Sequence, residues 1–283
     1  MATILDTRLI YQRLLGNLLR ERKRWGKIAL ASLAVGEDRA MLLYLAAQEK
    51  LAQTLDIDFR HYSFKRKIKV GSLLRLIKEL NRNKSVQGVI INKPLPVQGA
   101  EYALSRALLP TKDIEGVTPY NLGMVLLKKA YFLPPTVLSV LEIIKISGCD
   151  LWGKDTVIVG FSTHIGKPLS ILLADEFSTV CITHIATYQK KKLAFYVKNA
   201  DVVISCVGKP LLIKGEWIKR GSLIIDVGIA KYKGNVVGDV EFETARKKAA
   251  YITPVPGGVG LLTKLFLFKN LLKAKKEISR VRH

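Results

Sequence analysis

One stretch of the sequence indicates the fold most clearly: Thr156-Val-Ile-Val-Gly160-Phe-Ser-Thr-His-Ile-Gly166-Lys-Pro168. The apolar run predicts a buried strand, and the turn after it opens a helix. The backbone N–H groups and the dipole of such a helix can receive a pyrophosphate. The spacing Gly-x-Ser-x-x-x-Gly-x-Pro departs from the usual Gly-x-Gly-x-x-Gly, so the motif alone fits an ordinary strand-to-helix turn equally well.

The elements that follow this turn favour the dinucleotide interpretation. Short apolar runs alternate with helical patterns through the second half of the chain. This alternation predicts an α/β fold with a doubly wound, Rossmann-like parallel sheet. The further strands are expected at residues 179–183, 202–206, 223–227 and 251–253.

The first half of the chain is also α/β. Its strand at 86–92 is nearly all apolar, as in a parallel sheet that is buried on both faces. A proline-rich loop at 93–96 follows, and irregular sequence from 110 to 123 places a domain boundary near residue 120. The expected helices are 7–24, 40–55 and 71–83, and the expected extended segments are 28–35, 58–64 and 86–92.

Composition limits the possible classes of protein. With 283 residues and 49% hydrophobic content, the chain can fill two cores. The longest apolar run near the N-terminus, 28–35, is too short for a membrane helix, and no secretory signal is recognisable, so we expect a cytoplasmic protein. The three cysteines have no zinc-ligand spacing, and no metal is expected.

The net charge of +23 would attract polyanions. The basic clusters are spread along the chain, without interleaved aromatic residues or a nucleic-acid motif. A solvated lysine-rich surface is therefore favoured over a nucleic-acid partner, which remains an alternative. The clusters lie at residues 20–24, 65–69, 190–192, 246–248 and 273–282.

The residues after the second strand bear on cofactor preference. An NAD site usually places Asp or Glu there, about 20 residues beyond the first glycine. Here Thr183-His-Ile-Ala-Thr187 supplies no carboxylate that would repel a 2′-phosphate, and no arginine that would bind one. NADP is permitted, with Lys190 as a neighbouring cation, and NAD remains the alternative.

Several motifs occur in an order and spacing that resemble the pattern of one family, the methylenetetrahydrofolate dehydrogenase/cyclohydrolase (FolD) family. The most specific is Thr253-Pro-Val-Pro-Gly-Gly-Val-Gly260, and the resemblance spans nearly the whole chain. The others are Gly36-Glu-Asp with Tyr44, Pro94-Leu-Pro96, Lys112-Asp-Ile-Glu-Gly116 with Pro119 and Asn121, the turn from Gly160 to Pro168, Asp226-Val-Gly-Ile229 and Gly238-Asp-Val.

The resemblance implies two domains with an active-site cleft between them. Residues 1–120 plus 261–283 would form a folate-binding catalytic domain, and 121–260 an NAD(P)-binding domain through which a homodimer forms. The implied reaction is oxidation of 5,10-methylenetetrahydrofolate to the methenyl form, followed by hydrolysis to 10-formyltetrahydrofolate. This chemistry belongs to one-carbon metabolism and purine biosynthesis.

The resemblance also implies the site residues. Catalytic positions are Tyr44, Gln48 and Glu115, and substrate-binding positions are Asn92, Pro94, Pro256, Gly257 and Gly258. Cofactor-binding positions are Gly160, Phe161, Ser162, Ile165, Gly166, Pro168, Ile185, Gly208 and Ile229.

This sequence departs from the family where folate chemistry is done. The catalytic Tyr-x-x-x-Lys keeps Tyr44, but Gln48 stands where the lysine belongs. A glutamine amide only forms hydrogen bonds, whereas a lysine exchanges a proton and supplies charge. Asn92 replaces a glutamine, Lys93 an apolar residue, and Glu115 the aspartate expected at the pterin's amino edge. In the cofactor site, Phe161 and Ile185 replace residues that are often Arg and Ser.

Four interpretations follow from these departures. Hydride transfer requires positioning of two bound rings rather than an enzyme base, so a dehydrogenase with weak cyclohydrolase activity is favoured. A fully bifunctional enzyme is the first alternative. A non-enzymatic folate- or nucleotide-binding relative and a basic polyanion-binding module are the others.

Overall fold

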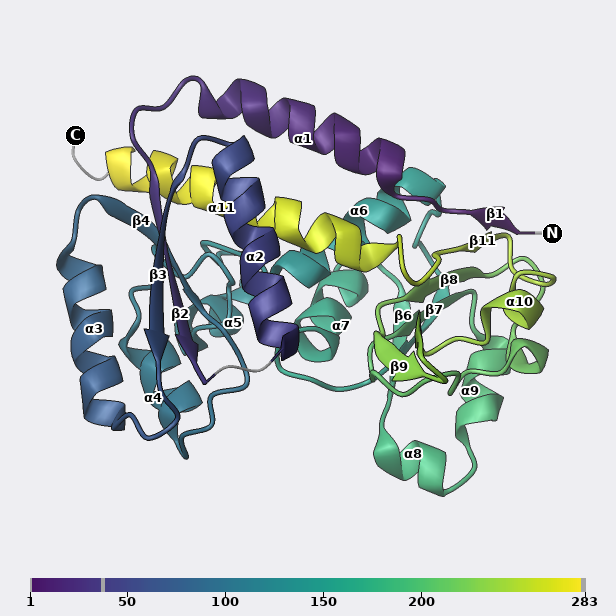
Figure 1. The fold of residues 1–283 in the computed structure, drawn as a ribbon. Coiled ribbons are helices and arrows are strands. Elements are labelled where there is room, and N and C mark those ends of the chain that lie inside the picture. The colour runs from purple at the N-terminus through teal and green to yellow at the C-terminus, as the bar shows by residue number, and fades with distance from the viewer. Residues whose placement is uncertain (1, 37–38, 281–283) are drawn as a thin grey trace. The chain divides into compact units, whose positions relative to one another are not determined.

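A computed structural model describes residues 2–36 and 39–280 (Figure 1). The chain forms two compact units. The large-sheet unit contains Met1–Arg13 and Thr136–Phe266, and the small-sheet unit contains Leu14–Pro135 and Leu267–His283. Each unit is described below by itself. Glu37 and Asp38, part of the Gly36-Glu-Asp motif, lie outside the described residues.

The large sheet has the order β1-β11-β8-β7-β5-β6, and every neighbouring pair is parallel (Figure 1). The order in which strands are added reverses at β5: β6 lies on one side of it, and β7 and then β8 lie on the other. This is the switch point of a Rossmann-like sheet, and it confirms the predicted fold class. The strands are β1 (Thr3–Ile4), β5 (Asp155–Val159), β6 (Thr179–Thr183), β7 (Val202–Ser205), β8 (Leu223–Asp226) and β11 (Tyr251–Ile252).

Helices connect these strands and cover them. Val203 and Ile224 of the central strands pack in one buried cluster with Leu193 and Val197 of α9 and Ala245 of α10. The helical elements of the unit are α6 (Pro135–Ser147), α7 (Gly166–Ala174), α8 (Ile185–Gln189), α9 (Leu193–Asn199), η1 (Gly215–Trp217) and α10 (Phe242–Ala245). The edge strand β1 and the hairpin of β9 (Ala230–Tyr232) and β10 (Asn235–Val237) were not predicted, because such short strands show no periodicity.

The small sheet is also parallel, in the order β3-β2-β4, with β3 (Asp58–Phe64), β2 (Ala29–Val35) and β4 (Val86–Ile91). Every residue of β2 and β4 is buried, as their apolar sequences predicted. Helix α3 (Val70–Arg82) buries Leu73, Ile77 and Leu80, a spacing that places them on one face toward the core. The other helices are α2 (Arg39–Thr54), α4 (Ala100–Ala107) and α5 (Pro119–Val125).

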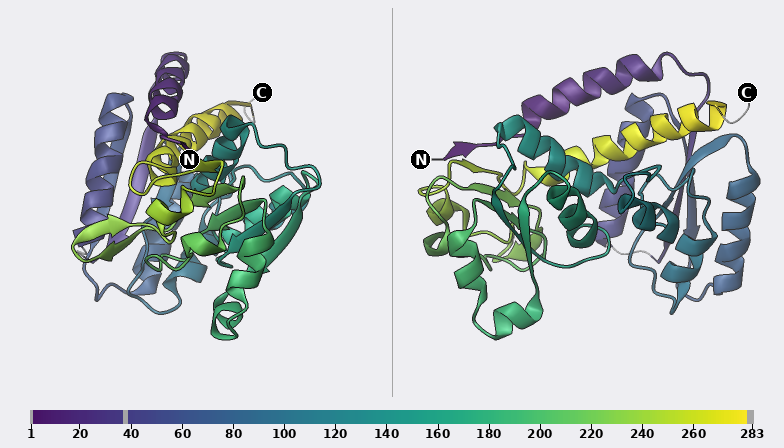
Figure 2. Two further views of the ribbon diagram at one scale, coloured as in Figure 1. Left: turned by 90° about the vertical axis from the view of Figure 1, so that its right-hand side faces the viewer. Right: turned by 180° about the vertical axis from the view of Figure 1, so that it is seen from behind.

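The C-terminal helix α11 (Val259–Arg280) is one unbroken helix (Figure 2), and its residues from Leu267 onward belong to the small-sheet unit. The Asn270 amide donates hydrogen bonds to the carbonyls of Ile114 (2.8 Å) and Leu133 (3.0 Å). A Cβ on Gly88 of β4 would lie 2.7 Å from Leu271 Cδ1, so glycine at this position lets the helix pack closely on the strand.

The units divide the chain at different residues from those expected. We expected boundaries near 120 and 260, whereas the divisions fall after Arg13, Pro135 and Phe266. Residues 1–13 join the large-sheet unit because β1 pairs with β11. Residues up to 135 stay with the small sheet because Asn121 accepts a hydrogen bond from the Tyr131 backbone (3.1 Å), and Lys273 binds the Tyr131 carbonyl (2.6 Å).

Candidate active site

The predicted cofactor residues gather at the carboxyl edge of the large sheet. Gly160 follows β5 directly, Ile185 follows β6, Gly208 follows β7 and Ile229 follows β8. Because these strands are parallel, their carboxyl ends meet at the same edge, which is where open α/β sheets bind ligands. The structure therefore brings these residues together at one edge of the sheet, and their role in binding a cofactor stays a prediction.

The turn from Gly160 to Gly166 has no space for side chains at its two glycines. Gly160 has a φ of +123°, and a Cβ there would lie 2.8 Å from Cys206 Sγ. A Cβ on Gly166 would lie 2.2 Å from the Gly160 carbonyl oxygen. The Ser162 hydroxyl accepts a hydrogen bond from the Ile165 N–H (3.2 Å), which closes the turn before α7. The turn thus presents backbone to a ligand, as a pyrophosphate site requires.

Apolar side chains flank this turn and face solvent. Phe161 is 48% exposed, Ile185 65% and Ile229 61%. Val207, between β7 and Gly208, is 47% exposed and was not predicted. Large exposed apolar side chains at a ligand-binding edge suit the flat rings of a dinucleotide. Pro168, by contrast, is buried inside α7 and supports the helix.

Two buried carboxylates hold the loops that follow β7 and β8. Asp226 accepts hydrogen bonds from the backbone N–H groups of Gly228, Asp239 and Val240. Asp239 accepts hydrogen bonds from the Ser205 hydroxyl and the Val207 N–H, both at 2.8 Å. Burial raises the pKa of Asp226 to about 7, although its backbone hydrogen bonds oppose the shift. Through its hydrogen bonds to Ser205 and Val207, Asp239 fixes the loop that carries Gly208.

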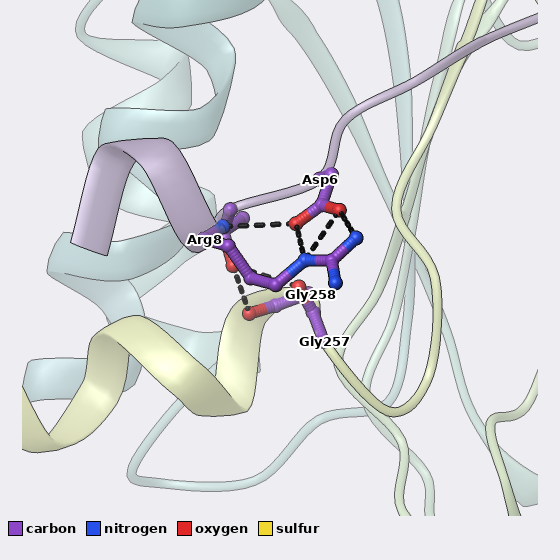
Figure 3. Close-up of polar contacts among 5 residues, drawn as sticks. Asp6, Arg8, Gly257 and Gly258 are labelled. Carbon is purple, nitrogen blue, oxygen red and sulfur yellow. Dashed lines mark hydrogen bonds and ion pairs between the residues drawn. The ribbon is translucent and has the colours of Figure 1, made fainter. Parts of the chain in front are cut away.

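The loop containing Pro256, Gly257 and Gly258 is held by the N-terminal segment (Figure 3). The buried Thr7 hydroxyl lies 2.8 Å from the Gly257 carbonyl oxygen and 2.9 Å from that of Gly258, and it donates to both. Gly257 has a φ of +103°, which favours glycine. Beside this contact, Asp6 and Arg8 form an exposed ion pair. Sequence reasoning missed Thr7, because residues 250 apart show no local signal.

In the small-sheet unit, Gln48 is fully buried and takes part in a closed hydrogen-bond network. The Ser32 hydroxyl donates to Gln48 Oε1 (3.3 Å), and Gln48 Nε2 donates to Asn92 Oδ1 (3.5 Å). Asn92 Nδ2 donates to Ser32 Oγ and to the Leu33 carbonyl, both at 2.9 Å. Ser32 was not predicted; a polar residue within the apolar run of β2 was its only signal.

Glu115 lies close enough to Tyr44 to raise the pKa of its phenol. Burial raises the pKa of Tyr44 to about 12, and the Glu115 carboxylate adds to this shift, while a hydrogen bond from Gln48 opposes it. The phenol is therefore neutral near pH 7 and acts only as a hydrogen-bond donor or acceptor.

Glu115 is itself strongly perturbed. Burial raises the pKa of Glu115 to about 7, against the Ile91 N–H that donates to its Oε2 at 3.0 Å. The Asp113 charge raises this pKa further, and the Lys93 charge lowers it. Lys93 precedes Pro94 through a cis peptide bond and pairs with Glu101 of α4 at 3.6 Å. A carboxyl that titrates near neutrality marks a functional-site candidate.

The predicted residues thus form two sets. Tyr44, Gln48, Asn92, Pro94 and Glu115 are gathered within the small-sheet unit, at the ends of β2 and β4 and along α2. Pro256 to Gly258 and all the cofactor residues belong to the large-sheet unit. The cleft between domains stays a prediction.

Fold and site together define a Rossmann-type dinucleotide-binding protein joined to a second α/β unit in which the partly buried Glu115 carboxyl lies near the exposed Tyr44. Residues 134–279 match the family model for the tetrahydrofolate dehydrogenase/cyclohydrolase NAD(P)-binding domain, and residues 5–115 match that for its catalytic domain. The chain therefore belongs to the tetrahydrofolate dehydrogenase/cyclohydrolase (FolD) family.

Individual relatives agree over almost their full length. The Bifunctional protein FolD of Nautilia profundicola is 39% identical over 98% of this chain and 99% of the relative. The crystal structure of the bifunctional FolD enzyme from Campylobacter jejuni is 33% identical, with a TM-score of 0.91 over 98% of this chain and 99% of that one. The Trypanosoma brucei FolD structure, complexed with NADP cofactor and inhibitor, is 32% identical, with a TM-score of 0.92 over 100% and 99%.

Two further observations concern membranes and metals. Within residues 2–36 and 39–280, no helix is long and apolar enough to cross a membrane. The same residues contain no group of three or more His, Cys, Asp or Glu side chains placed to hold a metal ion.

Proposed function

We propose that this protein is a cytoplasmic, homodimeric, NADP-dependent 5,10-methylenetetrahydrofolate dehydrogenase whose cyclohydrolase step is strongly weakened. The burial of the Gln48 amide carries this proposal. Its oxygen and nitrogen are engaged by Ser32 and Asn92, so the side chain at the lysine position neither exchanges a proton nor contributes positive charge.

The dehydrogenase step depends on parts that this chain retains. NADP, when bound, accepts the hydride from the one-carbon unit of the folate. The Gly160–Gly166 turn and the N-terminus of α7 offer backbone N–H groups to its pyrophosphate. The turn requires glycine, because a Cβ on Gly160 would clash with Cys206 and one on Gly166 with the Gly160 carbonyl oxygen. Exposed Phe161, Ile185 and Ile229 offer apolar surface to its rings. The protein's contribution is orientation, which is the main requirement of hydride transfer.

Glu115 is the group best suited to bind the pterin. When ionised, its carboxylate accepts hydrogen bonds from the amino group and ring N–H of a pterin. The Ile91 N–H fixes one carboxylate oxygen, which leaves the other for the ligand. Tyr44, neutral at physiological pH, offers a ring face and a hydroxyl beside this carboxyl.

A fully bifunctional enzyme is the second candidate, and Glu115 favours it. A buried carboxyl with a pKa of about 7, close to Tyr44, exchanges a proton at neutral pH and would assume the role of the missing lysine. The printed names of the relatives above also describe bifunctional proteins.

The test compares the wild type with a Gln48→Lys variant, using methylenetetrahydrofolate and either NADP or NAD. Methenyltetrahydrofolate absorbance reports both its formation and its decay. We expect product to accumulate with wild type and to decay at the uncatalysed rate, whereas the variant hydrolyses it at least about 100-fold faster, as for a restored general acid–base group. Gln53→Lys, which adds the same charge on the exposed face of α2, is the matched control.

The alternatives give different outcomes. Rapid decay with wild type would establish the bifunctional enzyme and contradict the proposed loss. No reduction of either cofactor, with tight folate or dinucleotide binding, would favour a non-enzymatic relative. If neither folate nor dinucleotide binds, the interpretation as a basic polyanion-binding protein would be favoured.

A further inference from the structure

A cavity of about 580 Å³ lies in the large-sheet unit, beside the predicted cofactor residues. Three lysines, Lys191, Lys209 and Lys214, line it together with the aromatic rings of Tyr188 and Trp217. None of the described residues lining it is Asp or Glu. The rest of the lining is mostly apolar, from Leu193, Ala194 and residues 210–212. Lysines and aromatic rings in such a lining suit a ligand that combines a phosphate with a flat ring.

The cavity's place in the sheet indicates which part of a dinucleotide it faces. Tyr188 lies in α8, directly after β6, and Lys209 follows Gly208 in the loop after β7. Strands β6 and β7 flank β5, and β5 leads into the Gly160 turn that fits a pyrophosphate. A dinucleotide whose pyrophosphate lies at this turn extends its adenosine end over the β6 side of the edge.

Lys209 is the lysine best prepared to meet a phosphate. Its Nζ lies 4.1 Å from the centroid of the Tyr188 ring, so a cation–π interaction orients the ammonium at the cavity wall. Lys214 already forms an ion pair, because its Nζ lies 3.4 Å from the Glu241 carboxylate. The segment from His184 to Thr187, where a carboxylate would exclude a 2′-phosphate, contains no acidic residue.

We propose that this cavity receives the adenine and the 2′-phosphate of NADP, and that Lys209, held by Tyr188, selects NADP over NAD. The inference rests on the proposed dinucleotide site and assigns its specificity to a loop outside the glycine turn. Lysine after β7 would thus compensate for the absence of arginine at position 161 and of serine at position 185.

Equilibrium binding without folate tests the proposal. Wild type is expected to bind 2′,5′-ADP at least about tenfold more tightly than 5′-AMP, the worth of one charge-assisted hydrogen bond. Lys209→Met should remove this preference and weaken NADP binding by about tenfold while leaving NAD binding unchanged. Lys198→Met removes the same charge from the exposed end of α9, outside the cavity, and controls for the general field of a +23 protein.

Two substitutions of Tyr188 separate orientation from charge. Tyr188→Phe keeps the ring face and should retain NADP preference, whereas Tyr188→Leu loses the cation–π contact and should weaken NADP binding about threefold. The proposal is overturned if Lys209→Met weakens NADP and NAD equally, or if wild type does not distinguish 2′,5′-ADP from 5′-AMP. Because these are binding measurements, a protein that selects 2′,5′-ADP yet does not oxidise folate would contradict the proposed function alone.

Discussion

The predicted cofactor site and the predicted folate site of this protein differ in the groups that form them. At the edge of the large sheet, backbone N–H groups and glycines without room for a Cβ form the turn from Gly160 to Gly166. In the small-sheet unit, the candidate site consists of side chains: the buried amides Gln48 and Asn92, and the partly buried Glu115 carboxyl beside them on Ile91. A site made of backbone tolerates changes in neighbouring side chains, whereas a site made of side chains changes its chemistry with each substitution.

The departures from the family pattern follow this difference. Phe161 and Ile185 replace polar residues around the dinucleotide turn, yet the turn keeps its shape, because its shape depends on glycine. Gln48 replaces a lysine in the small-sheet unit, and the local network closes around the amide. We therefore expect cofactor binding to survive and the hydrolytic step to be lost.

The largest effect should come from adding one methyl group to the backbone-built site. In Gly166→Ala, the new Cβ would lie 2.2 Å from the Gly160 oxygen, so the turn must move. We expect NADP affinity to fall by about 100-fold, in line with the cost of overpacking. Gly16→Ala, on α1 (Arg8–Arg22) where a Cβ meets nothing within 4 Å, is the control. Unchanged NADP affinity in Gly166→Ala, measured by calorimetry, would contradict a backbone-built site.

A smaller effect is expected when the folate pocket loses its charge. Glu115→Gln should raise the KM for methylenetetrahydrofolate at pH 8 by at least about tenfold, because an amide forms weaker hydrogen bonds to the pterin than a carboxylate does. The pKa of Glu115 is raised to about 7, so the carboxylate is ionised above this pH and protonated below it.

The pH dependence of the same variant sharpens the test. The wild-type KM for folate should rise as the pH falls from 8 to 6, while the variant's KM should vary little across this range. The NADP affinities of wild type and variant, compared at each pH, are the internal control: they should be equal, because Glu115 lies in the unit that does not contain the predicted NADP site. Parallel pH profiles for the two proteins would exclude Glu115 as the titrating pterin ligand.

The smallest effect concerns the contact between the N-terminal segment and the glycine loop (Figure 3). Thr7→Val removes the hydroxyl that binds the carbonyls of Gly257 and Gly258, and we expect the folate KM to rise about threefold with NADP affinity unchanged. Thr7→Ser should restore the wild-type KM, because it keeps the hydroxyl. A folate KM that remains at the wild-type value in Thr7→Val would show that the loop keeps its shape without this contact.

Sequence reasoning predicted the elements that carry strong local patterns. The apolar runs of β2, β4, β5 and β7 and the glycine turn after β5 were placed within a residue or two, because burial on both faces leaves a continuous apolar signal. The short strand β1 and the β9–β10 hairpin were not predicted, because strands of two or three residues show no periodicity. Thr7, Ser32 and Asp239 were missed as site residues because their partners are distant in sequence, and only the folded chain brings them together.

Helix α11 has a consequence for synthesis on the ribosome. Residues 14–135 emerge early, but the core of their unit is completed by Leu267 onward, including Asn270 and Leu271 against Ile114 and Gly88. The small-sheet unit therefore completes its core only after residues 136–266 of the large-sheet unit, and then Leu267 onward, have been synthesised. Until then the Ile114 and Leu133 carbonyls lack their Asn270 partner and bind water, and the apolar surface that α11 covers is exposed to solvent and to chaperones.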